Sequence, residues 1–370
     1  MTENNDFTLF LDKLIAKNCF FAVWSMPGSS TPEILITTNQ ELIYPAQFNK
    51  LNGQEGFVFA PYNISEPSPL VLLKPGIYKK GIDQILQIDI DQLATNQTDE
   101  VVSHHHVIKK EDYLKDIEAT ITEITNTKLS KVIVSRIIPC RRKSEPAGEL
   151  YRQLFQQTPN AFVYLVNLPK AGLWMGATPE VLLKSEGKMI ETVSLAGTQS
   201  RSSGPDYSWH TKDIEEQAFV SRYLLDVFYR FNIHPYTTQG PETMESGRVA
   251  HLSTSFRFSS KKLSRNLGDF IAELHPTPAV CGYPKTKAAR FISKIEQHDR
   301  RYYTGYLGPW RLNGSVRLFV NLRCMEIVPD WYFLYSGGGI TARSLPEEEW
   351  EETNNKAQTL LSAIEAVQNK

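Results

Sequence analysis

The feature that most constrains the fold is a pair of acidic residues three positions apart, here called an acidic step, which occurs twice at distant places in the chain. Asp213 and Glu216 stand three residues apart, and so do Glu349 and Glu352. Residues at this spacing project from one face of a helix. A fold that brings both faces together would offer four hard oxygen ligands, which suit Mg²⁺. Either step alone is also typical of a solvated helix face, and carboxylates are favoured near helix N-termini in any case.

Composition indicates a globular protein that binds neither nucleic acid nor a membrane. The 370 residues are 41% hydrophobic and 22% charged, with a net charge of −1, which gives no electrostatic footprint for nucleic acid or anionic lipid. No apolar run approaches the ~18 residues that a membrane span needs, and the polar, acidic N-terminus is unlike a secretory signal. The four cysteines are scattered, which favours a reducing compartment. We therefore expect a cytoplasmic protein.

The first hundred residues contain no chemical motif. Residues 7–100 have the pattern of short strands and turns, with strands expected at 20–25, 33–36, 56–60 and 70–73. The polar stretch 95–108, which includes His104, His105 and His106, has the composition of a linker. The three histidines would either bind a metal or be exposed and idle, and we favour the second interpretation.

The rest of the chain alternates β-branched runs with amphipathic segments. Its expected strands are 132–138, 161–166, 173–177, 181–184, 189–193, 317–326 and 331–335. Its expected helices are 110–125, 213–231, 288–297 and 347–368. Both acidic steps then lie in the first turn of a helix.

Three charged residues stand in or beside apolar strands. Lys131 opens the strand 132–138, where a lysine is usually exposed or snorkelling but acts as a base when partly desolvated. Glu180, at the joint of two strands, is either a surface acid or a positioned one. Arg323 lies inside the expected strand 317–326, and a buried guanidinium needs an anionic partner.

Small and rigid segments suit the wall of a binding site. Gly197 and Thr198 follow the strand 189–193, in a turn whose backbone N–H groups would receive a carboxylate. Gly337–Gly339 follow the strand 331–335 and permit a close backbone approach. An ordinary turn explains the first equally well, and a bulge or hairpin turn explains the second. Two prolines and a glycine stiffen His275–Gly282.

In this order, these motifs resemble the chorismate-utilising enzymes, which include anthranilate, aminodeoxychorismate, isochorismate and salicylate synthases. The resemblance covers roughly residues 110–365 and rests on Lys131–Arg136, Ala177–Glu180, Leu195–Thr198, Lys212–Glu216, His275–Ala279, Tyr303–Gly308, Arg323, Gly337–Ile340 and Glu349–Lys356. It implies an α/β (α+β) fold, a single large unit with two antiparallel sheets stacked face to face and helices outside. Residues 1–100 would form its variable N-terminal part and 108–368 the catalytic region.

The resemblance also implies a chorismate site that depends on Mg²⁺. Glu216 and Glu349 would be the metal ligands, with Asp213 and Glu352 in support, directly or through water. The metal would hold the ring carboxylate. The implied substrate-binding residues are Arg323, Tyr303, Gly337 and Gly339 at the enolpyruvyl carboxylate, Gly197, Thr198 and Lys356 at the ring carboxylate, and His275 and Ala279 on the wall. A dianionic substrate makes this set of donors physically reasonable.

One position separates family members that use ammonia from those that add water. The first carry glutamine where this chain has Lys131, whereas the second carry lysine. Lys131 would take a proton from water as it attacks C2 of the ring, and Glu180 would protonate the leaving C4 hydroxyl. The product would be isochorismate, made without a glutamine amidotransferase subunit. A binding protein that has lost catalysis would be expected to lack at least one of these residues.

Two further positions refine this expectation. Salicylate-forming members tend to carry threonine where this chain has Ala279, so alanine favours release of isochorismate, with a salicylate synthase as the alternative. Many relatives carry histidine where this chain has Gln217, and glutamine does not titrate near pH 7. A menaquinone pathway and a siderophore pathway suit the chain equally.

Overall fold

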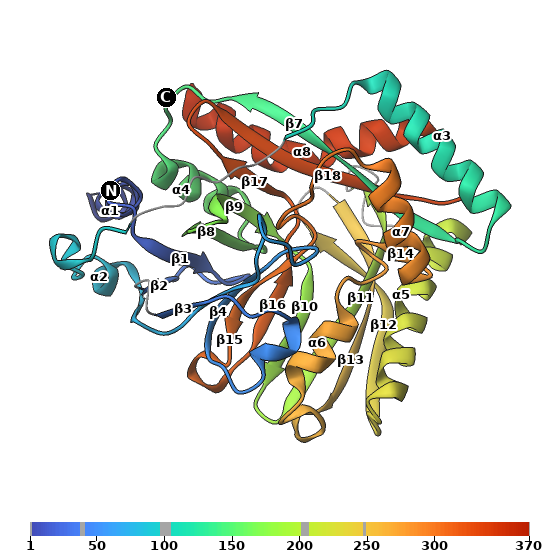
Figure 1. Cartoon of the computed structure of the whole chain (residues 1–370), viewed down its shortest axis with the longest axis horizontal. Coiled ribbons are helices and arrows are strands. Elements are labelled where there is room, and N and C mark those ends of the chain that lie inside the picture. The colour runs from blue at the N-terminus through green and yellow to red at the C-terminus, as the bar shows by residue number, and fades with distance from the viewer. Residues whose placement is uncertain (1, 38–40, 97–104, 201–206, 247–248, 370) are drawn as a thin grey trace.

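The computed structural model describes residues 2–37, 41–96, 105–200, 207–246 and 249–369, which form two antiparallel sheets lying face to face (Figure 1). Each sheet contains nine of the described strands. Across sheet A the strands are β14 (Gly282–Tyr283), β7 (Lys131–Arg141), β18 (Trp331–Ile340), β17 (Cys324–Ile327), β9 (Gly172–Thr178), β8 (Phe162–Leu168), β1 (Phe20–Ser25), β2 (Pro32–Thr37) and β6 (Ile77–Lys80). Across sheet B they are β12 (Tyr236–Ser246), β13 (Val249–Ser259), β11 (Met189–Ser200), β10 (Val181–Glu186), β16 (Arg317–Val320), β15 (Tyr306–Trp310), β4 (Gly56–Ala60), β5 (Val71–Leu73) and β3 (Leu42–Ile43). The predicted pair of stacked antiparallel sheets is confirmed.

Aromatic residues fill the space between the sheets. Phe162 on β8 of sheet A stacks on Phe319 on β16 of sheet B, with ring centroids 4.2 Å apart. Phe59 on β4 packs edge-on against Trp174 on β9, at 6.2 Å. Both pairs belong to one buried cluster to which the two sheets contribute. Such ring contacts add to the gain from burying large apolar side chains, so this core fixes the relative position of the sheets.

Helices cover the outer faces of both sheets, as predicted. Their bounds are α1 (Thr2–Ala16), α2 (Ile82–Ile85), α3 (Lys110–Asn126), α4 (Ala147–Gln157), α5 (Thr211–Arg230), α6 (Leu267–Leu274), α7 (Lys285–Ile295) and α8 (Pro346–Gln368). α1, α4 and α8 pack on sheet A, α5 and α6 pack on sheet B, and α3 and α7 pack beside β7. Figure 1 shows α8 in red along β18. No helix in the described ranges is long and apolar enough to span a membrane.

The first hundred residues contribute strands to both sheets. β1, β2 and β6 join sheet A, while β3, β4 and β5 join sheet B. The expectation of short strands and turns over 7–100 is wrong at its start, where α1 forms, and at the short helix α2 (Figure 1). Phe7, Phe10, Leu11 and Leu14 are buried against sheet A. Their spacing is that of an amphipathic helix, so the pattern was present in the sequence.

The segment expected as one strand, 317–326, is two strands in different sheets. β16 ends at Val320 in sheet B, and β17 begins at Cys324 in sheet A. Arg323, just before β17, has a left-handed backbone with φ of 47°. Strand geometry does not admit that conformation, so Arg323 lies at a crossover between the sheets and not inside a strand. The expected pairing with 331–335 holds for β17, which pairs with β18.

Two expected turns are parts of continuous strands. β18 runs through Gly337–Gly339 and pairs with β7 along its length. β11 continues to Ser200, with a register shift against β13 between Ala196 and Thr198 and a φ of 74° at Gly197. Such a shift is a β-bulge, which bends a strand locally. The hairpin of β12 and β13 has no counterpart among the predicted elements.

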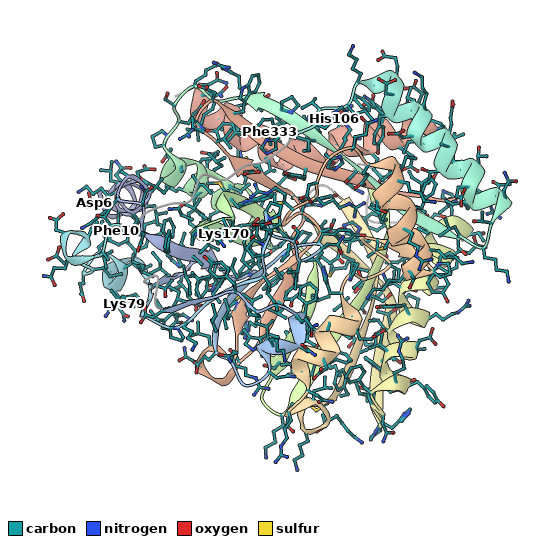
Figure 2. All side chains as sticks on the ribbon, viewed as in Figure 1. Asp6, Phe10, Lys79, His106, Lys170 and Phe333 are labelled. Atoms are coloured by element: carbon teal, nitrogen blue, oxygen red, sulfur yellow. The ribbon has the colours of Figure 1, made fainter. Side chains whose placement is uncertain are left out.

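The histidine-rich segment is partly packed into the structure. The ring of His105 stacks on Phe333 with centroids 3.6 Å apart, and its Nε2 lies 2.8 Å from Oε2 of Glu326. His106 is exposed (Figure 2), and His104 lies outside the described residues. The prediction of exposed, idle histidines is therefore wrong for His105.

Candidate active site

A pocket with a cavity volume of about 160 Å³ lies where both sheets meet the first turns of α5 and α8. Sheet A contributes β7 and β18 to its wall, and sheet B contributes β11 and β13. The predicted site residues that line it are Lys131, Glu180, Gly197, Asp213, Glu216, Ala279, Tyr303, Arg323, Gly337, Gly339, Glu352 and Lys356. The fold thus brings together residues from distant parts of the chain.

Both acidic steps lie at the starts of helices beside this pocket, as predicted. Asp213 and Glu216 on α5 and Glu352 on α8 line it, while Glu349 is buried in the first turn of α8. Asp213 has a second task, because its Oδ2 accepts a hydrogen bond from the backbone N–H of His210 at 3.1 Å. That contact caps α5, so part of the reason for an acid at this position is structural.

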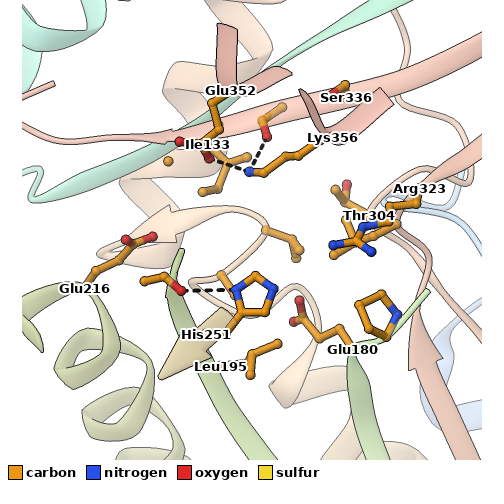
Figure 3. Close-up of a pocket in the computed structure, with 18 of the residues that line it drawn as sticks. Ile133, Glu180, Leu195, Glu216, His251, Thr304, Arg323, Ser336, Glu352 and Lys356 are labelled. Carbon is orange, nitrogen blue, oxygen red and sulfur yellow. Dashed lines mark hydrogen bonds and ion pairs between the residues drawn. The ribbon is translucent and has the colours of Figure 1, made fainter. Parts of the chain in front are cut away.

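Two lysines pair with the acids. The Nζ of Lys131, fully buried at the start of β7, lies 2.5 Å from Oε1 of Glu216. The Nζ of Lys356 lies 2.6 Å from Oε1 of Glu352 and donates to the carbonyl of Gly337 at 2.9 Å (Figure 3). Burial alone would lower the pKa of Lys356, but the neighbouring carboxylates, Glu352 foremost, raise it above its ordinary value.

The acids offer suitable ligands for Mg²⁺, although the lysines hold two of them. Within the described ranges, no three histidine, cysteine or acidic side chains converge as a preformed metal cage. Glu349 and Glu216 nevertheless approach adjacent glycines. A Cβ on Gly338 would lie 2.7 Å from Oε2 of Glu349, and one on Gly339 would lie 3.1 Å from Oε1 of Glu216. Successive residues of a strand face opposite sides of the sheet, so Glu216 borders the pocket from one face of β18 while Glu349 lies behind the other face. The acids that line the pocket, Asp213, Glu216 and Glu352, are oxygen ligands of the kind that a hard cation prefers, and they would fit one once Lys131 releases Glu216.

Arg323 and Glu180 occupy the other end of the pocket (Figure 3). Neither side chain makes a hydrogen bond or an ion pair with another described residue. Burial lowers the pKa of Arg323, yet a guanidinium remains charged at any physiological pH. Burial raises the pKa of Glu180 to about 7, against the opposing charges of Lys131 and Lys356. This end therefore presents a cation and a carboxyl group that retains a proton near neutral pH.

His251, on β13, lines the pocket and is absent from the predicted residues. Its Nδ1 lies 3.1 Å from the carbonyl of Gly197 (Figure 3). Because a carbonyl only accepts, Nδ1 carries the hydrogen. Burial, and then the charge of Arg323, lowers the pKa of His251 to about 4, so the imidazole is neutral. The local sequence gives no signal for it beyond one histidine among small residues.

Three predicted residues are not in the lining. Glu349 lies behind Gly338, as described above, and the side chain of Thr198 lies outside the described residues. His275 is buried elsewhere, with its Nε2 3.1 Å from the carbonyl of Tyr62, and burial lowers its pKa to about 3. His275 therefore supports the loop that carries Ala279, and the predicted substrate contact has no counterpart in this geometry.

Gln217, the departure from many relatives, holds α5 to sheet B. Its Nε2 donates to Oγ1 of Thr254 on β13 at 2.7 Å and to Oγ of Ser221 at 3.0 Å. The side chain is buried. An amide suits these hydroxyl partners at every pH, so the position next to Glu216 is a fixed structural contact.

Comparisons with known proteins identify relatives of this chain. A family model described as "Chorismate binding enzyme" matches residues 70–365. The chain is 30% identical over 262 residues to the vibriobactin-specific isochorismate synthase of Vibrio cholerae serotype O1, which covers 68% of this chain and 66% of that protein. It is 25% identical over 313 residues to the isochorismate synthase EntC of Escherichia coli K12, which covers 82% of this chain and 79% of that protein.

The fold is also that of a solved relative. The menaquinone-specific isochorismate synthase MenF from Escherichia coli matches with a TM-score of 0.72 at 19% identity, over 94% of this chain and 88% of that one. At this identity the likeness concerns the fold alone. The family model, however, spans most of the chain and all of the pocket. The chain belongs to the chorismate binding enzyme family.

Proposed function

We propose that this chain is an isochorismate synthase, an isomerase that adds water at C2 of chorismate and releases the C4 hydroxyl. The names of its relatives support this assignment. The observation that carries it is that Lys131 and Glu180 line one pocket together with Arg323. These residues supply a candidate base, a candidate acid and a cation for a dianionic substrate.

Arg323 would bind the enolpyruvyl carboxylate. A guanidinium without a side-chain partner among the described residues favours an anionic ligand and can hold a carboxylate with two hydrogen bonds. The hydroxyl of Tyr303 is near the same wall, 3.0 Å from the point where a Cβ on Gly337 would lie. The backbone of Gly337 and Gly339 would approach the ligand closely because neither residue has a side chain.

The ring carboxylate would lie at the acidic end of the pocket. Mg²⁺ held by Glu216 and Glu349, with Asp213 and Glu352 in support, would neutralise its charge. Lys356 lies at this end as well, held by Glu352. Chorismate would thus span the pocket, with one carboxylate at the acids and the other at Arg323.

Lys131 and Glu180 would catalyse the addition of water at C2 and the loss of the C4 hydroxyl as water. The free amine of Lys131 would take a proton from the water that attacks C2, while the protonated carboxyl of Glu180 would give its proton to the departing C4 hydroxyl. The pKa of about 7 for Glu180 suits an acid at neutral pH. In the ligand-free structure the Nζ of Lys131 lies 2.5 Å from Oε1 of Glu216, so the base role requires that this pair open.

Ala279 bears on the choice between releasing isochorismate and eliminating pyruvate from it. It lines the pocket, at the position where salicylate-forming members tend to carry threonine. A methyl group cannot donate or accept a hydrogen bond during the elimination. We therefore propose that isochorismate is released intact, with a salicylate synthase as the alternative.

The test is to incubate purified protein with chorismate and Mg²⁺, without ammonia, and to separate the products by chromatography while pyruvate is assayed. We expect isochorismate without pyruvate, and loss of conversion when Mg²⁺ is chelated. Salicylate with stoichiometric pyruvate would establish the alternative. Conversion only on addition of ammonia would overturn the role given to Lys131. Stabilisation by chorismate without turnover would indicate a binding protein.

A further inference from the structure

We propose that Arg300, which does not line the pocket, is a positioning residue that sets the spacing between two of its walls. One wall is β7, which carries Lys131, and the other is the segment His275–Cys281, which carries Ala279. The inference rests on the proposed function of this pocket. In this proposal, Arg300 keeps Lys131, the candidate base, in its position relative to the wall that carries Ala279 and would border the substrate ring.

The side chain of Arg300 bridges the two walls directly. Its Nη1 donates to the carbonyl of Val280 and its Nη2 to the carbonyl of Ile133, each at 2.8 Å. Val280 and Ile133 both line the pocket. Because a guanidinium is planar and rigid, these two hydrogen bonds fix the distance between one wall and the other.

Glu296 holds Arg300 in this orientation. Oε2 of Glu296 accepts from Nε of Arg300 and Oε1 accepts from Nη2, each at 2.7 Å. Both side chains are almost fully buried, with exposed fractions of 2% for Arg300 and 4% for Glu296. A paired, bidentate contact in such surroundings restricts the arginine to one geometry.

The same pair reaches the remaining walls. Oε1 of Glu296 also accepts from the backbone N–H of Ser135 at 2.7 Å, and Ser135 pairs with Gly337 across β7 and β18. The carbonyl of Arg300 accepts from the N–H of Tyr303 at 2.8 Å. The segment 296–303 thus links Tyr303 to β7 and, through the pairing of β7 with β18, to Gly337. These contacts lie outside the pocket.

The far end of the segment His275–Cys281 has its own anchor. Nζ of Lys285 donates to the carbonyls of Glu273 and His275, at 2.8 and 2.7 Å. Arg300 holds the near end at Val280. Cys281 and β14 are also hydrogen-bonded to β7, so loss of Arg300 would leave this backbone pairing as the remaining tie to β7 at the near end and would loosen the segment at Val280.

The expected consequence is a loss of turnover and not of binding. Among the described residues, the Arg300 side chain makes no hydrogen bond or ion pair with the groups proposed to bind the two carboxylates. Misplacement of reacting groups by about 1 Å costs about 10²-fold in rate. A variant at Arg300 should then lower kcat by about 10²-fold while KM for chorismate changes little.

The adjacent residue provides a matched control. Arg301 is equally buried, with 3% exposed, and it pairs with Glu326. Its Nη2 donates to the carbonyls of Lys170 and Ala171, at 3.1 and 3.0 Å. Neither of these residues lines the pocket. Arg301→Gln should therefore disturb folding as much as Arg300→Gln does, without moving the walls.

The experiment compares these two variants in the full chain by kcat and KM, by thermal unfolding, and by amide hydrogen exchange at Ile133. The N–H of Ile133 donates to the carbonyl of Cys281 at 2.9 Å, so its exchange reports directly on the contact between the walls. We expect faster exchange and about 10²-fold lower kcat for Arg300→Gln, and neither change for Arg301→Gln. If Arg300→Gln does not fold, the same measurements are made on Arg300→Lys, which keeps the charge but lacks the planar fork that bonds to both walls at once.

Equal kcat losses in the two variants, or unchanged exchange at Ile133 in Arg300→Gln, would overturn the proposal. So would faster exchange with full kcat, because the walls would then move without consequence. If the wild-type protein does not convert chorismate, the proposed function fails. The exchange at Ile133 still decides whether Arg300 holds the walls together.

Discussion

The two ends of the pocket handle charge in opposite ways. At the acidic end, Glu216 and Glu352 are each paired with a lysine. At the other end, neither Arg323 nor Glu180 makes a hydrogen bond or an ion pair through its side chain with another described residue, and Glu180 has a raised pKa. At the acidic end, two lysines of the protein offset two of the carboxylates. The other end carries a charge that a ligand would have to neutralise, because a buried unpaired charge is costly.

This difference indicates what each end exchanges on binding. A carboxylate that is paired with a lysine would exchange the ammonium group for a metal ion, so that its charge remains compensated. An arginine without a partner gains most from an anion that arrives with the substrate. The predictions below test whether the paired and the unpaired ends differ in this sense.

The largest effect is expected at the paired end, for Lys131→Ala. Removal of the candidate base should lower turnover by about 10³-fold or more, with the protein still folded by circular dichroism. Lys184→Ala provides the control, because Lys184 pairs with Glu191 at 2.9 Å and lies outside the pocket. Substantial residual activity in Lys131→Ala would remove this lysine as the base.

A smaller effect is expected at the unpaired end, for Arg323→Gln. Loss of a charged contact to the substrate should raise KM for chorismate by about 10²-fold, measured by steady-state kinetics. The ligand-free variant should be at least as stable as wild type, because no side-chain hydrogen bond or ion pair to a described residue is broken. A drop in melting temperature without a change in KM would show that Arg323 has a structural partner and would remove the contrast between the ends.

The smallest effect concerns stability and pH, for Glu180→Gln. Folding raises the pKa of Glu180 from 4.5 to about 7, so the folded protein binds more protons than the unfolded chain in that window. Stability due to this group is therefore present below pH 4.5 and is lost as the pH rises through 7. Glutamine cannot ionise, so the variant should be more stable than wild type at pH 8, by on the order of 1–3 kcal/mol, and equal to it at pH 4.

Thermal unfolding at the two pH values measures this difference. In wild type, kcat should also fall above about pH 7, as the candidate acid loses its proton. Identical pH dependence of stability in both proteins would mean that Glu180 titrates normally. The two ends would then differ in geometry and not in protonation.

Residues with a strong local pattern were predictable from the sequence. The amphipathic helices 110–125, 213–231 and 347–368 form where expected, and each acidic step begins in a first turn and ends in the second. Lys131 and Glu180 line the predicted pocket. These elements have periodic apolar faces or motif residues at fixed spacing, so local information suffices for them.

Features that depend on tertiary geometry were not predictable. Arg323 lies at a crossover between two sheets, and no local pattern marks its left-handed backbone. In the hairpin that carries His251, β12 is rich in threonine and glutamate and lacks the apolar alternation of a typical strand, whereas β13 has that alternation at Ala250, Leu252, Phe256 and Phe258. His275 belongs to a rigid segment that suits the wall of a pocket, but its imidazole contacts the carbonyl of Tyr62, which is distant in the sequence. A local pattern does not reveal such a contact.

The central claim is that Lys131 activates a water molecule for attack at C2 while Glu180 releases the C4 hydroxyl. Conversion of unlabelled chorismate in oxygen-18 water, stopped at an early time point and read by mass spectrometry, tests it most directly. The account predicts one labelled oxygen in each isochorismate, at C2, and no label in the remaining chorismate. Isochorismate without label would mean that the hydroxyl migrates within the substrate, and it would contradict the roles given to both residues.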